Sequence, residues 1–260
     1  MRNSEHDEDG SDMTEAIETG GTDIQVVARC AQVVRMFSSE HRTVRVAQVA
    51  SELGVGRTTA HRYLASLANA GFLERDGTGY GLGPLLAHVG TLALNGFGVV
   101  EIADPYLRDL ADVAEETAVL SVWAGRSPVV VRCHEPENRV LNISIRVGRT
   151  LNLDAAQAAV FLAHRTDRVD ALLDQLDEPQ ADRIRRRIDD ARRTGVAVSD
   201  TINVGVRVIA APVLDREGVI VATVAIIGTV HTLSPDLDSG KVLALRDTAA
   251  RLSSALGFAP

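Results

Sequence analysis

Residues 54–67, GVGRTTAHRYLASL, gather hydrogen-bond donors without a single acid. A helix that begins near Arg57, at about 100° per residue, separates these side chains from the apolar ones. One face carries Ala60, Tyr63, Leu64 and Leu67, and the opposite face carries Thr58, His61, Arg62 and Ala65. An ordinary solvated face would usually include an acid. Arginine donates to guanine O6 and N7 or to phosphate, and threonine can contact thymine, so this face predicts a helix in the DNA major groove.

The charge of the chain is unevenly distributed. The formal net charge is -8, yet residues 24–83 hold seven arginines and four acids. Residues 1–23 hold eight acids against Arg2, and residues 84–260 are mildly acidic. Residues 1–22 contain few large apolar side chains, which predicts a disordered acidic tail. The basic excess is therefore confined to the segment that contains the donor-rich helix.

The elements around this helix predict a winged helix-turn-helix domain over residues 23–83. A first helix, Ile24–Phe37, has Ile24, Val27, Ala28, Ala31 and Val34 at helical spacing. A second fits Val46–Leu53, and the recognition helix fits 57–68. Strands at Phe72–Arg75 and Tyr80–Leu82 around a tight turn form a wing, 72–82, with Arg75 near the DNA backbone.

These residues also carry a family resemblance. The segment VAQVASELGVGRTTAHRYLASLANAGFLERDGTGYGLGP resembles the DNA-binding segment of the IclR family of bacterial transcriptional regulators. The likeness includes Thr-x-x-Arg at Thr59 and Arg62, and Tyr-x-Leu-Gly from Tyr80 to Gly83. Arg45 departs from the Ser or Thr helix cap that members often have. The expected DNA-binding residues are Arg57, Thr58, Thr59, His61, Arg62 and Arg75.

Beyond the wing, a linker helix is predicted over residues 84–100. Its apolar residues Leu85, Val89 and Leu92 stand at i, i+4 and i+7 and favour dimerisation. Residues 101–260 mix apolar runs with helical stretches. The runs are Val119–Val122, Val129–Cys133, Leu141–Val147, Val206–Ala211 and Val219–Ile227, and the helices are Ala103–Thr117, Asp154–Ala163, Asp182–Thr194 and Leu237–Leu256. The whole chain is predicted to be α+β, with a C-terminal antiparallel sheet flanked by helices.

The second domain resembles the IclR effector-binding domain, which is similar to the GAF small-molecule-binding fold. The likeness lies in VGRTLNLDAAQAAVFLA and GVRVIAAPVLDREGVIVATVAIIG. It implies an effector pocket lined by Ala156, Gln157, Val206, Val208, Ala225 and Ile227. Asp200 is a further polar candidate, and Trp123 is either a wall of the pocket or part of the core. Because this lining is mostly apolar, the effector is expected to be partly apolar, such as an aromatic acid or alcohol.

Other chemistry has little support in the sequence. No Gly-x-Ser-x-Gly turn or Gly-rich phosphate loop occurs. Cys133 and His134 are adjacent, and adjacent strand residues point to opposite faces, so an ordinary strand end is favoured over a catalytic pair. Neither Cys30 nor Cys133 has the neighbours of a disulfide or zinc site, and no metal or cofactor is expected. The charged run at 183–193 is interpreted as a solvated surface rather than a second DNA site.

The sequence thus predicts a cytoplasmic regulator that responds to a ligand. A homodimer or homotetramer would bind a near-palindromic operator in double-stranded DNA, because two-fold pairing places two recognition helices on successive turns. No export or membrane segment is visible. Two alternatives stay open, namely an enzyme with an accessory helical domain and a module that binds a protein partner.

Overall fold

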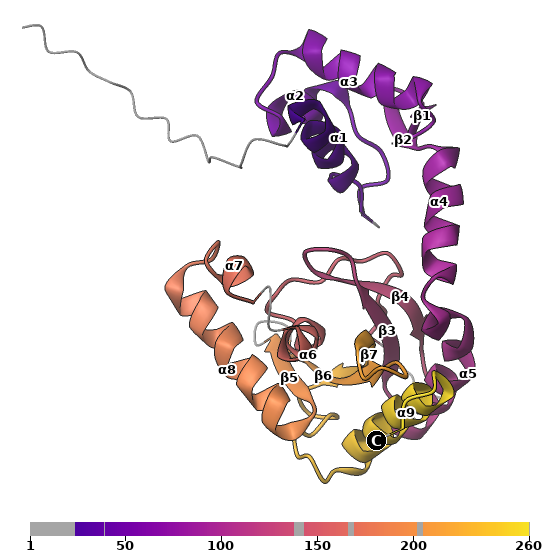
Figure 1. Ribbon diagram of the computed structural model, residues 1–260, viewed down its shortest axis with the longest axis vertical. Coiled ribbons are helices and arrows are strands. Elements are labelled where there is room, and N and C mark those ends of the chain that lie inside the picture. The colour runs from indigo at the N-terminus through magenta and orange to yellow at the C-terminus, as the bar shows by residue number, and fades with distance from the viewer. Residues whose placement is uncertain (1–23, 39, 138–142, 166–168, 202–204, 260) are drawn as a thin grey trace, which may run out of the picture.

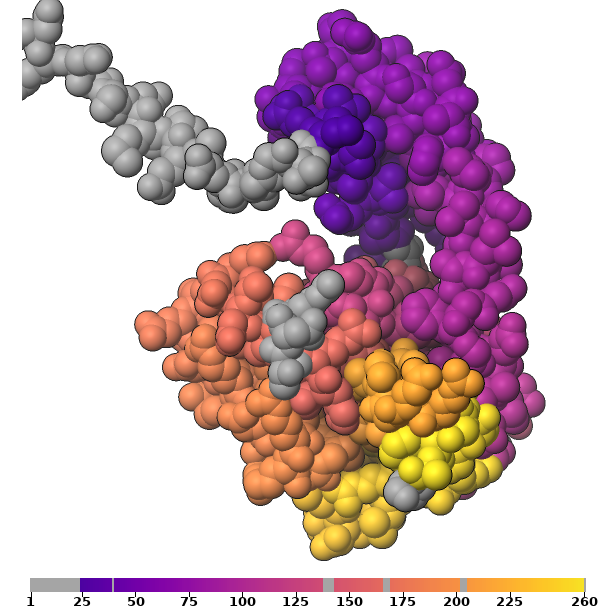
Figure 2. All heavy atoms as spheres, in the orientation of Figure 1, coloured from indigo at the N-terminus to yellow at the C-terminus, as the bar shows by residue number. Residues whose placement is uncertain are grey.

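The computed structural model describes residues 24–259 except 39, 138–142, 166–168 and 202–204, so the predicted acidic tail lies outside the described residues. Two lobes are joined along one side by helices that form a bridge between them (Figures 1 and 2). The N-terminal lobe contains α1 Gln25–Arg35, α2 Val46–Glu52, α3 Arg57–Asn69, β1 Leu73–Asp76 and β2 Gly79–Leu82. The predicted winged helix-turn-helix is confirmed.

The predicted apolar face of α3 packs into the core of this lobe. Ala60 and Leu64 are fully buried and Leu67 is nearly so. The start of α2, which Arg45 put in doubt, is fixed without a Ser or Thr cap, because the Arg45 N–H donates to Gln48 Oε1 at 2.8 Å. A side-chain acceptor at this position satisfies one of the free donors of the first turn.

The apolar stripe that predicted α1 as a helix is largely exposed at its N-terminal end. Ile24 is 68% exposed and Val27 is 64% exposed. The core is instead contacted by Val33, which is fully buried, and by the half-buried Cys30. The helix was predicted correctly, whereas periodicity identifies apolar stripes without showing which residues meet the core.

The wing is a short antiparallel hairpin with a third strand segment beside it. β1 and β2 pair from Leu73 opposite Leu82 to Asp76 opposite Gly79, one residue later than predicted for the first strand. Val44 and Tyr80 exchange two backbone hydrogen bonds of 2.9 Å. The loop before α2 is thereby tied to the wing, so α2, α3 and the wing form one unit.

The predicted linker helix is two helices. α4 spans Pro84–Asn95 and α5 spans Gly98–Ala114, and their axes meet at 75°. The helix expected from Ala103 therefore begins earlier, and the linker helix ends before residue 100. Phe97 lies between the two and packs against the core of the C-terminal lobe, which fixes the direction of α5. No single helix among the described residues is long and apolar enough to cross a membrane; α4 and α5 pass that test only when joined.

The C-terminal lobe is built on a five-stranded antiparallel sheet between two pairs of helices (Figure 1). In spatial order the strands are β4 Pro128–His134, β3 Thr117–Trp123, β7 Ile220–Thr229, β6 Val206–Leu214 and β5 Ala197–Thr201. Helices α5 and α9, Gly240–Ala255, cover one face, while α6, Ala156–His164, and α8, Glu178–Thr194, cover the other. Alternate residues separate the two cores: Leu120 faces the α5 side and Val119 faces the α6 side.

Three parts of this lobe differ from the sequence-based expectation. Strand β5 and the short helix α7, Val169–Leu173, were not predicted. The strand predicted at Leu141–Val147 is wrong for 143–147, which have no regular secondary structure, while 141 and 142 lie outside the described residues. The Ile143 carbonyl accepts a hydrogen bond of 2.8 Å from Thr117 Oγ1, so a side chain holds this segment to the sheet.

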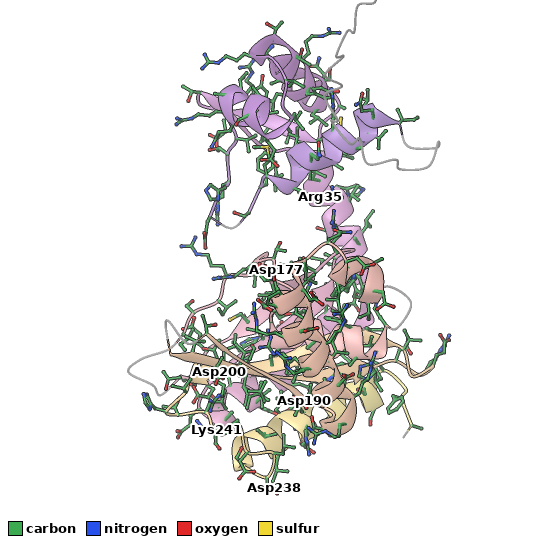
Figure 3. All side chains as sticks on the ribbon, turned by 90° about the vertical axis from the view of Figure 1, so that its left-hand side faces the viewer. Arg35, Asp177, Asp190, Asp200, Asp238 and Lys241 are labelled. Atoms are coloured by element: carbon green, nitrogen blue, oxygen red, sulfur yellow. The ribbon has the colours of Figure 1, made fainter. Side chains whose placement is uncertain are left out.

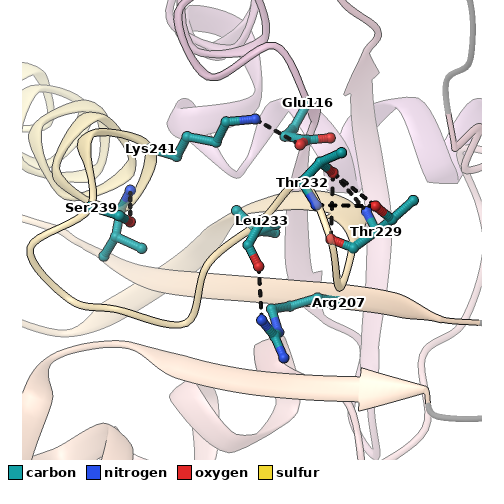
Figure 4. A network of polar contacts seen from close by, with 8 residues as sticks. Glu116, Arg207, Thr229, Thr232, Leu233, Ser239 and Lys241 are labelled. Atoms are coloured by element: carbon teal, nitrogen blue, oxygen red, sulfur yellow. Dashed lines mark hydrogen bonds and ion pairs between the residues drawn. The ribbon is translucent and has the colours of Figure 1, made fainter.

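A network of polar contacts connects the sheet to α9 and to the segment that precedes it (Figure 4). The Glu116 side chain is 2% exposed and accepts a hydrogen bond of 2.8 Å from Lys241 Nζ. Arg207 Nη1 donates to the Leu233 carbonyl at 2.9 Å, and Ser239 caps the first turn of α9. These contacts hold the segment between β7 and α9 against the sheet.

Candidate DNA-binding surface and ligand cavity

The face of α3 turned away from the core is solvent-exposed. It carries Arg57, Thr58, Thr59, His61 and Arg62. None of these side chains makes a hydrogen bond or ion pair within the described part of the chain. An exposed helix face with two free guanidinium groups and no acid can donate to base edges and phosphates.

Arg75 on the wing is positioned by the tyrosine opposite it. Arg75 and Tyr80 are directly paired in the hairpin, and the guanidinium carbon lies 4.8 Å from the centre of the Tyr80 ring. The ring is 1% exposed and therefore rigidly held, whereas Arg75 is exposed. The stacking keeps the arginine on the wing surface, available to a ligand beyond it.

A cavity of about 840 Å³ opens on the α6 and α8 side of the sheet. Its walls come from α8, the beginning of α6, strands β5, β6 and β7, and the irregular segment 143–155. Five of the expected effector residues line it, namely Gln157, Asp200, Val206, Val208 and Ile227. A volume of this size accommodates a small organic molecule.

The other three expected residues do not line the cavity. Ala156 and Ala225 are fully buried between α6 and the sheet. Trp123 lies against Phe161, with ring centroids 5.6 Å apart, and its Nε1 donates to the Gly125 carbonyl at 2.9 Å. Of the two interpretations left open for Trp123, the structure supports the core.

Arginines make the cavity more polar than the sequence suggested. Arg149, Arg183 and Arg187 are part of the lining. Arg187 is half-buried and donates to the backbone carbonyl of Asp154. Burial lowers the pKa of the Arg187 guanidinium, and the Asp154 carboxylate opposes that shift. The expected lining of mainly apolar residues was incomplete. Arg183 and Arg187 come from α8, which the resemblance did not single out, and Arg149 lies in a segment that carries the resemblance but was not among the implied lining residues.

The interpretation of 183–193 as a solvated surface is correct for only part of the run. Arg185, Arg192 and Arg193 form exposed ion pairs with acids three residues earlier, at 3.2, 3.2 and 2.7 Å. Figure 3 shows Asp177 just before α8 and Asp190 within it, with Asp200 on the neighbouring sheet. Arg183 and Arg187 belong to the cavity instead. Their spacing of four residues, which places both on one side of the helix, was a signal available in the sequence.

Asp200, which lines the cavity from the edge strand β5, is paired with an arginine on the neighbouring strand β6. Asp200 accepts two hydrogen bonds from Arg207, at 2.7 Å to Nε and 2.6 Å to Nη2. The hydrogen bond from Arg207 is the main reason that the pKa of Asp200 lies below its ordinary value. Asp200 thus lines the cavity as a paired carboxylate.

Cys133 and His134 point to opposite sides of β4, as predicted. Cys133 packs on the α6 side, and burial raises the pKa of its thiol. His134 Nε2 lies 3.2 Å from Asp104 Oδ1 on α5. The two side chains are not placed to act as a nucleophile and base.

Family models match both lobes. The IclR helix-turn-helix domain matches residues 26–77, and the bacterial transcriptional regulator IclR C-terminal domain matches 91–254. The glycerol operon regulatory protein of Streptomyces coelicolor is 31% identical over 255 residues, covering 90% of this chain and 97% of that protein. The transcriptional repressor AllR of Klebsiella pneumoniae is 25% identical over 252 residues, covering 91% of each.

Solved structures share the fold. An IclR transcriptional regulator from Silicibacter sp. TM1040 has a TM-score of 0.78 at 22% identity, covering 90% of this chain and 97% of that one. An IclR homolog from Microbacterium hydrocarbonoxydans, complexed with 4-hydroxybenzoate, has a TM-score of 0.68 at 20% identity, covering 89% and 98%. This chain belongs to the IclR family: it is a DNA-binding transcriptional regulator with a C-terminal effector-binding domain.

Proposed function

We propose that α3 enters the major groove of an operator and that Arg62 contacts a base there. The observation that carries this proposal is the exposed, acid-free face of α3, whose arginines have no partner in the described part of the chain. Arg62 stands in the middle of that face, with His61 and Thr58 beside it. Arg57, in the first turn of the helix, is proposed to contact a phosphate of the DNA backbone. Thr59 is proposed to make a further contact with the DNA.

The wing is proposed to follow the DNA backbone next to the groove. Arg75 is the contact residue, because stacking on Tyr80 holds its guanidinium on the exposed side of the hairpin. A phosphate contact of this kind fixes the register of the protein without reading sequence.

The cavity beside α8 is proposed as the site of a partly apolar effector. Support comes from five of the expected residues lining one volume, and from Val206, Val208 and Ile227 forming an apolar wall. The related protein from M. hydrocarbonoxydans is complexed with 4-hydroxybenzoate, a small molecule of that general kind. Ligand control requires that the effector bind one arrangement of the DNA-binding lobes better than another.

Self-association is proposed to run through α4. Leu85, Val89 and Leu92 are 36%, 49% and 59% exposed and lie along one side of the helix. An uncovered stripe of this kind favours a partner, and a second copy of the chain would pair two recognition helices on a near-palindromic operator. The assembly is a homodimer or homotetramer.

The proposed domain organisation is a DNA-binding domain over residues 23–83, a linker over 84–100 and an effector-binding domain over 101–260. Support comes from the two family models: one matches 26–77, within the DNA-binding domain, and the other, of a bacterial transcriptional regulator, matches 91–254, which begins inside the linker. The protein is proposed to act in the cytoplasm, where its DNA is, and to regulate without catalysis.

The test is a gel shift with the DNA upstream of the protein's own coding region. Arg62→Ala is expected to weaken operator binding by about 1 to 3 kcal/mol and to relax selectivity at one base pair. Arg35→Ala is the matched control. Arg35 is the last residue of α1 and lies at the end of the N-terminal lobe that faces the C-terminal lobe (Figure 3), away from α3. Equal affinity of wild type and Arg62→Ala for the operator would show that α3 is not the reading helix.

A further inference from the structure

The charges around the cavity do not cancel. Three arginines, Arg149, Arg183 and Arg187, line it together with two acids, Asp154 and Asp200. Asp200 is already held by two hydrogen bonds from Arg207. The cavity is therefore left with an excess of positive charge among its described residues.

Two of these guanidinium groups have no partner of their own. The side chains of Arg149 and Arg183 make no hydrogen bond or ion pair within the described part of the chain. Arg183 stands one helical turn before Arg187 and is close enough that their like charges oppose each other. Arg183 and Arg187 therefore lie on the same side of α8 and line the cavity together, and two neighbouring guanidinium groups form a site for an oxyanion.

Gln157 adds a polar group from α6. Its side chain lines the cavity, is only 2% exposed, and has no hydrogen-bond partner among the described residues. It stands in the first turn of α6, where the helix N-terminus adds partial positive charge. Because this amide lines the cavity and hydrogen-bonds to no described residue, a polar atom of a ligand is its expected complement.

The remaining wall is apolar. Val206, Val208 and Ile227 come from neighbouring strands and face the cavity together. A fully hydrated inorganic ion would leave this wall without a contact. The ligand that satisfies both walls has a charged end and an apolar body.

We propose that the effector is an organic carboxylate whose charged group is held by Arg183 and Arg187 and whose apolar body packs on Val206, Val208 and Ile227. The inference rests on the proposed function, since it takes the cavity to be the effector site. It narrows that proposal from a partly apolar molecule to an anion, and it assigns the recognition of its charge to α8.

The experiment is calorimetry of the full chain with carboxylates and their matched primary amides. The probes are benzoate and benzamide, 4-hydroxybenzoate and 4-hydroxybenzamide, phenylacetate and phenylacetamide, and hexanoate and hexanamide. Each pair keeps the apolar body and removes the charge. At least one carboxylate is expected to bind roughly tenfold or more tightly than its amide, since hydrogen bonds to charged groups are the stronger ones.

Variants on α8 assign the preference to its arginines. Arg183→Gln and Arg187→Gln are each expected to remove most of the preference for the acid while leaving the affinity of the amide within about twofold. Arg183 is exposed, so its substitution keeps the test valid even where the loss of the Arg187 contact to Asp154 impairs folding. Arg186→Gln is the control, because it removes the same charge from an exposed site outside the cavity lining.

Val208→Phe separates the two proposals. In one outcome the carboxylate and its amide bind the wild-type protein equally tightly, and Val208→Phe abolishes the binding of both. The cavity is then the effector site and the anion assignment is wrong. If Val208→Phe leaves carboxylate binding intact, the cavity is not the effector site and the proposed function fails with it. The anion assignment is also overturned if no carboxylate of the set binds at millimolar concentration, or if Arg186→Gln costs as much as Arg183→Gln.

Discussion

Arg207 and Asp200 stand directly opposite each other on strands β6 and β5, joined by two hydrogen bonds of 2.7 and 2.6 Å. Their side chains are 13% and 34% exposed, so the pair is partly shielded from water. Because Arg207 also donates to the Leu233 carbonyl, it links the sheet edge to the segment that leads into α9. The pair therefore holds the sheet edge together, and its Asp200 also lines the cavity.

Arg207→Ala is expected to lower the free energy of unfolding by about 1 to 3 kcal/mol at neutral pH, less than for a fully buried pair because water screens Asp200. The pKa of Asp200 is depressed in the folded state. The pair therefore contributes fully above the unfolded carboxyl pKa of about 3.9 and loses its contribution as the pH falls through the lower folded value. Urea unfolding at neutral pH and below pH 4 measures this; a difference that stays constant down to acid pH contradicts it.

Arg57→Ala is expected to weaken binding to the operator and to random DNA by similar factors. Arg57 lies exposed at the start of α3, where a phosphate contact carries no sequence information. The slope of log K against log salt should fall in magnitude by about 0.9 for one lost phosphate contact. Fluorescence anisotropy over a salt series provides both values. An unchanged slope with altered base preference would instead assign Arg57 to a base.

Val89→Asp is expected to shift the protein toward the monomer and to weaken operator binding. The change puts a charge in the middle of the exposed stripe of α4, where Val89 is 49% exposed. Ala87→Asp is the matched control, since residue 87 lies about 200° around the same helix from residue 89. Sedimentation velocity reports the mass of each variant. If both variants retain the wild-type mass, association runs through another surface.

Tyr80→Phe is expected to leave the stability unchanged or to raise the free energy of unfolding by up to about 1 kcal/mol. The Tyr80 hydroxyl is buried and has no hydrogen-bond partner in the described part of the chain. Removing it relieves an unsatisfied group and keeps the ring under Arg75. Tyr80→Leu serves for comparison, because it removes the ring and should destabilise the wing. Chemical denaturation distinguishes the two, and a large loss for Tyr80→Phe would reveal a partner for the hydroxyl.

The DNA-binding face could be predicted because everything it needs is local. The periodicity of one helix separates Leu64 from Arg62, and the structure buries the first and exposes the second. The hairpin followed in the same way from turn residues between short apolar runs. Local patterns do not show which residues of α1 meet the core: Ile24 and Val27 have helical apolar spacing, yet both stay exposed while Val33 is buried.

The cavity could be predicted only in part because its walls are brought together by long-range contacts. Arg187 reaches Asp154 from 33 residues away, and no local pattern indicates that meeting. Val206, Val208 and Ile227 were identified through the resemblance, which follows strand positions well. Ala225 shares their face of the sheet but lies under α6, so alternation alone could not tell a lining residue from a covered one.

The 75° bend between α4 and α5 makes α4 a lever arm. α4 has 12 residues and is therefore ~18 Å long. A change of about 10° at the bend moves its far end by ~3 Å, close to the rise of one base pair along DNA. Phe97 lies at the bend and packs against the core of the C-terminal lobe, so a small rearrangement of that core would move the N-terminal lobe by about one base-pair step of the DNA.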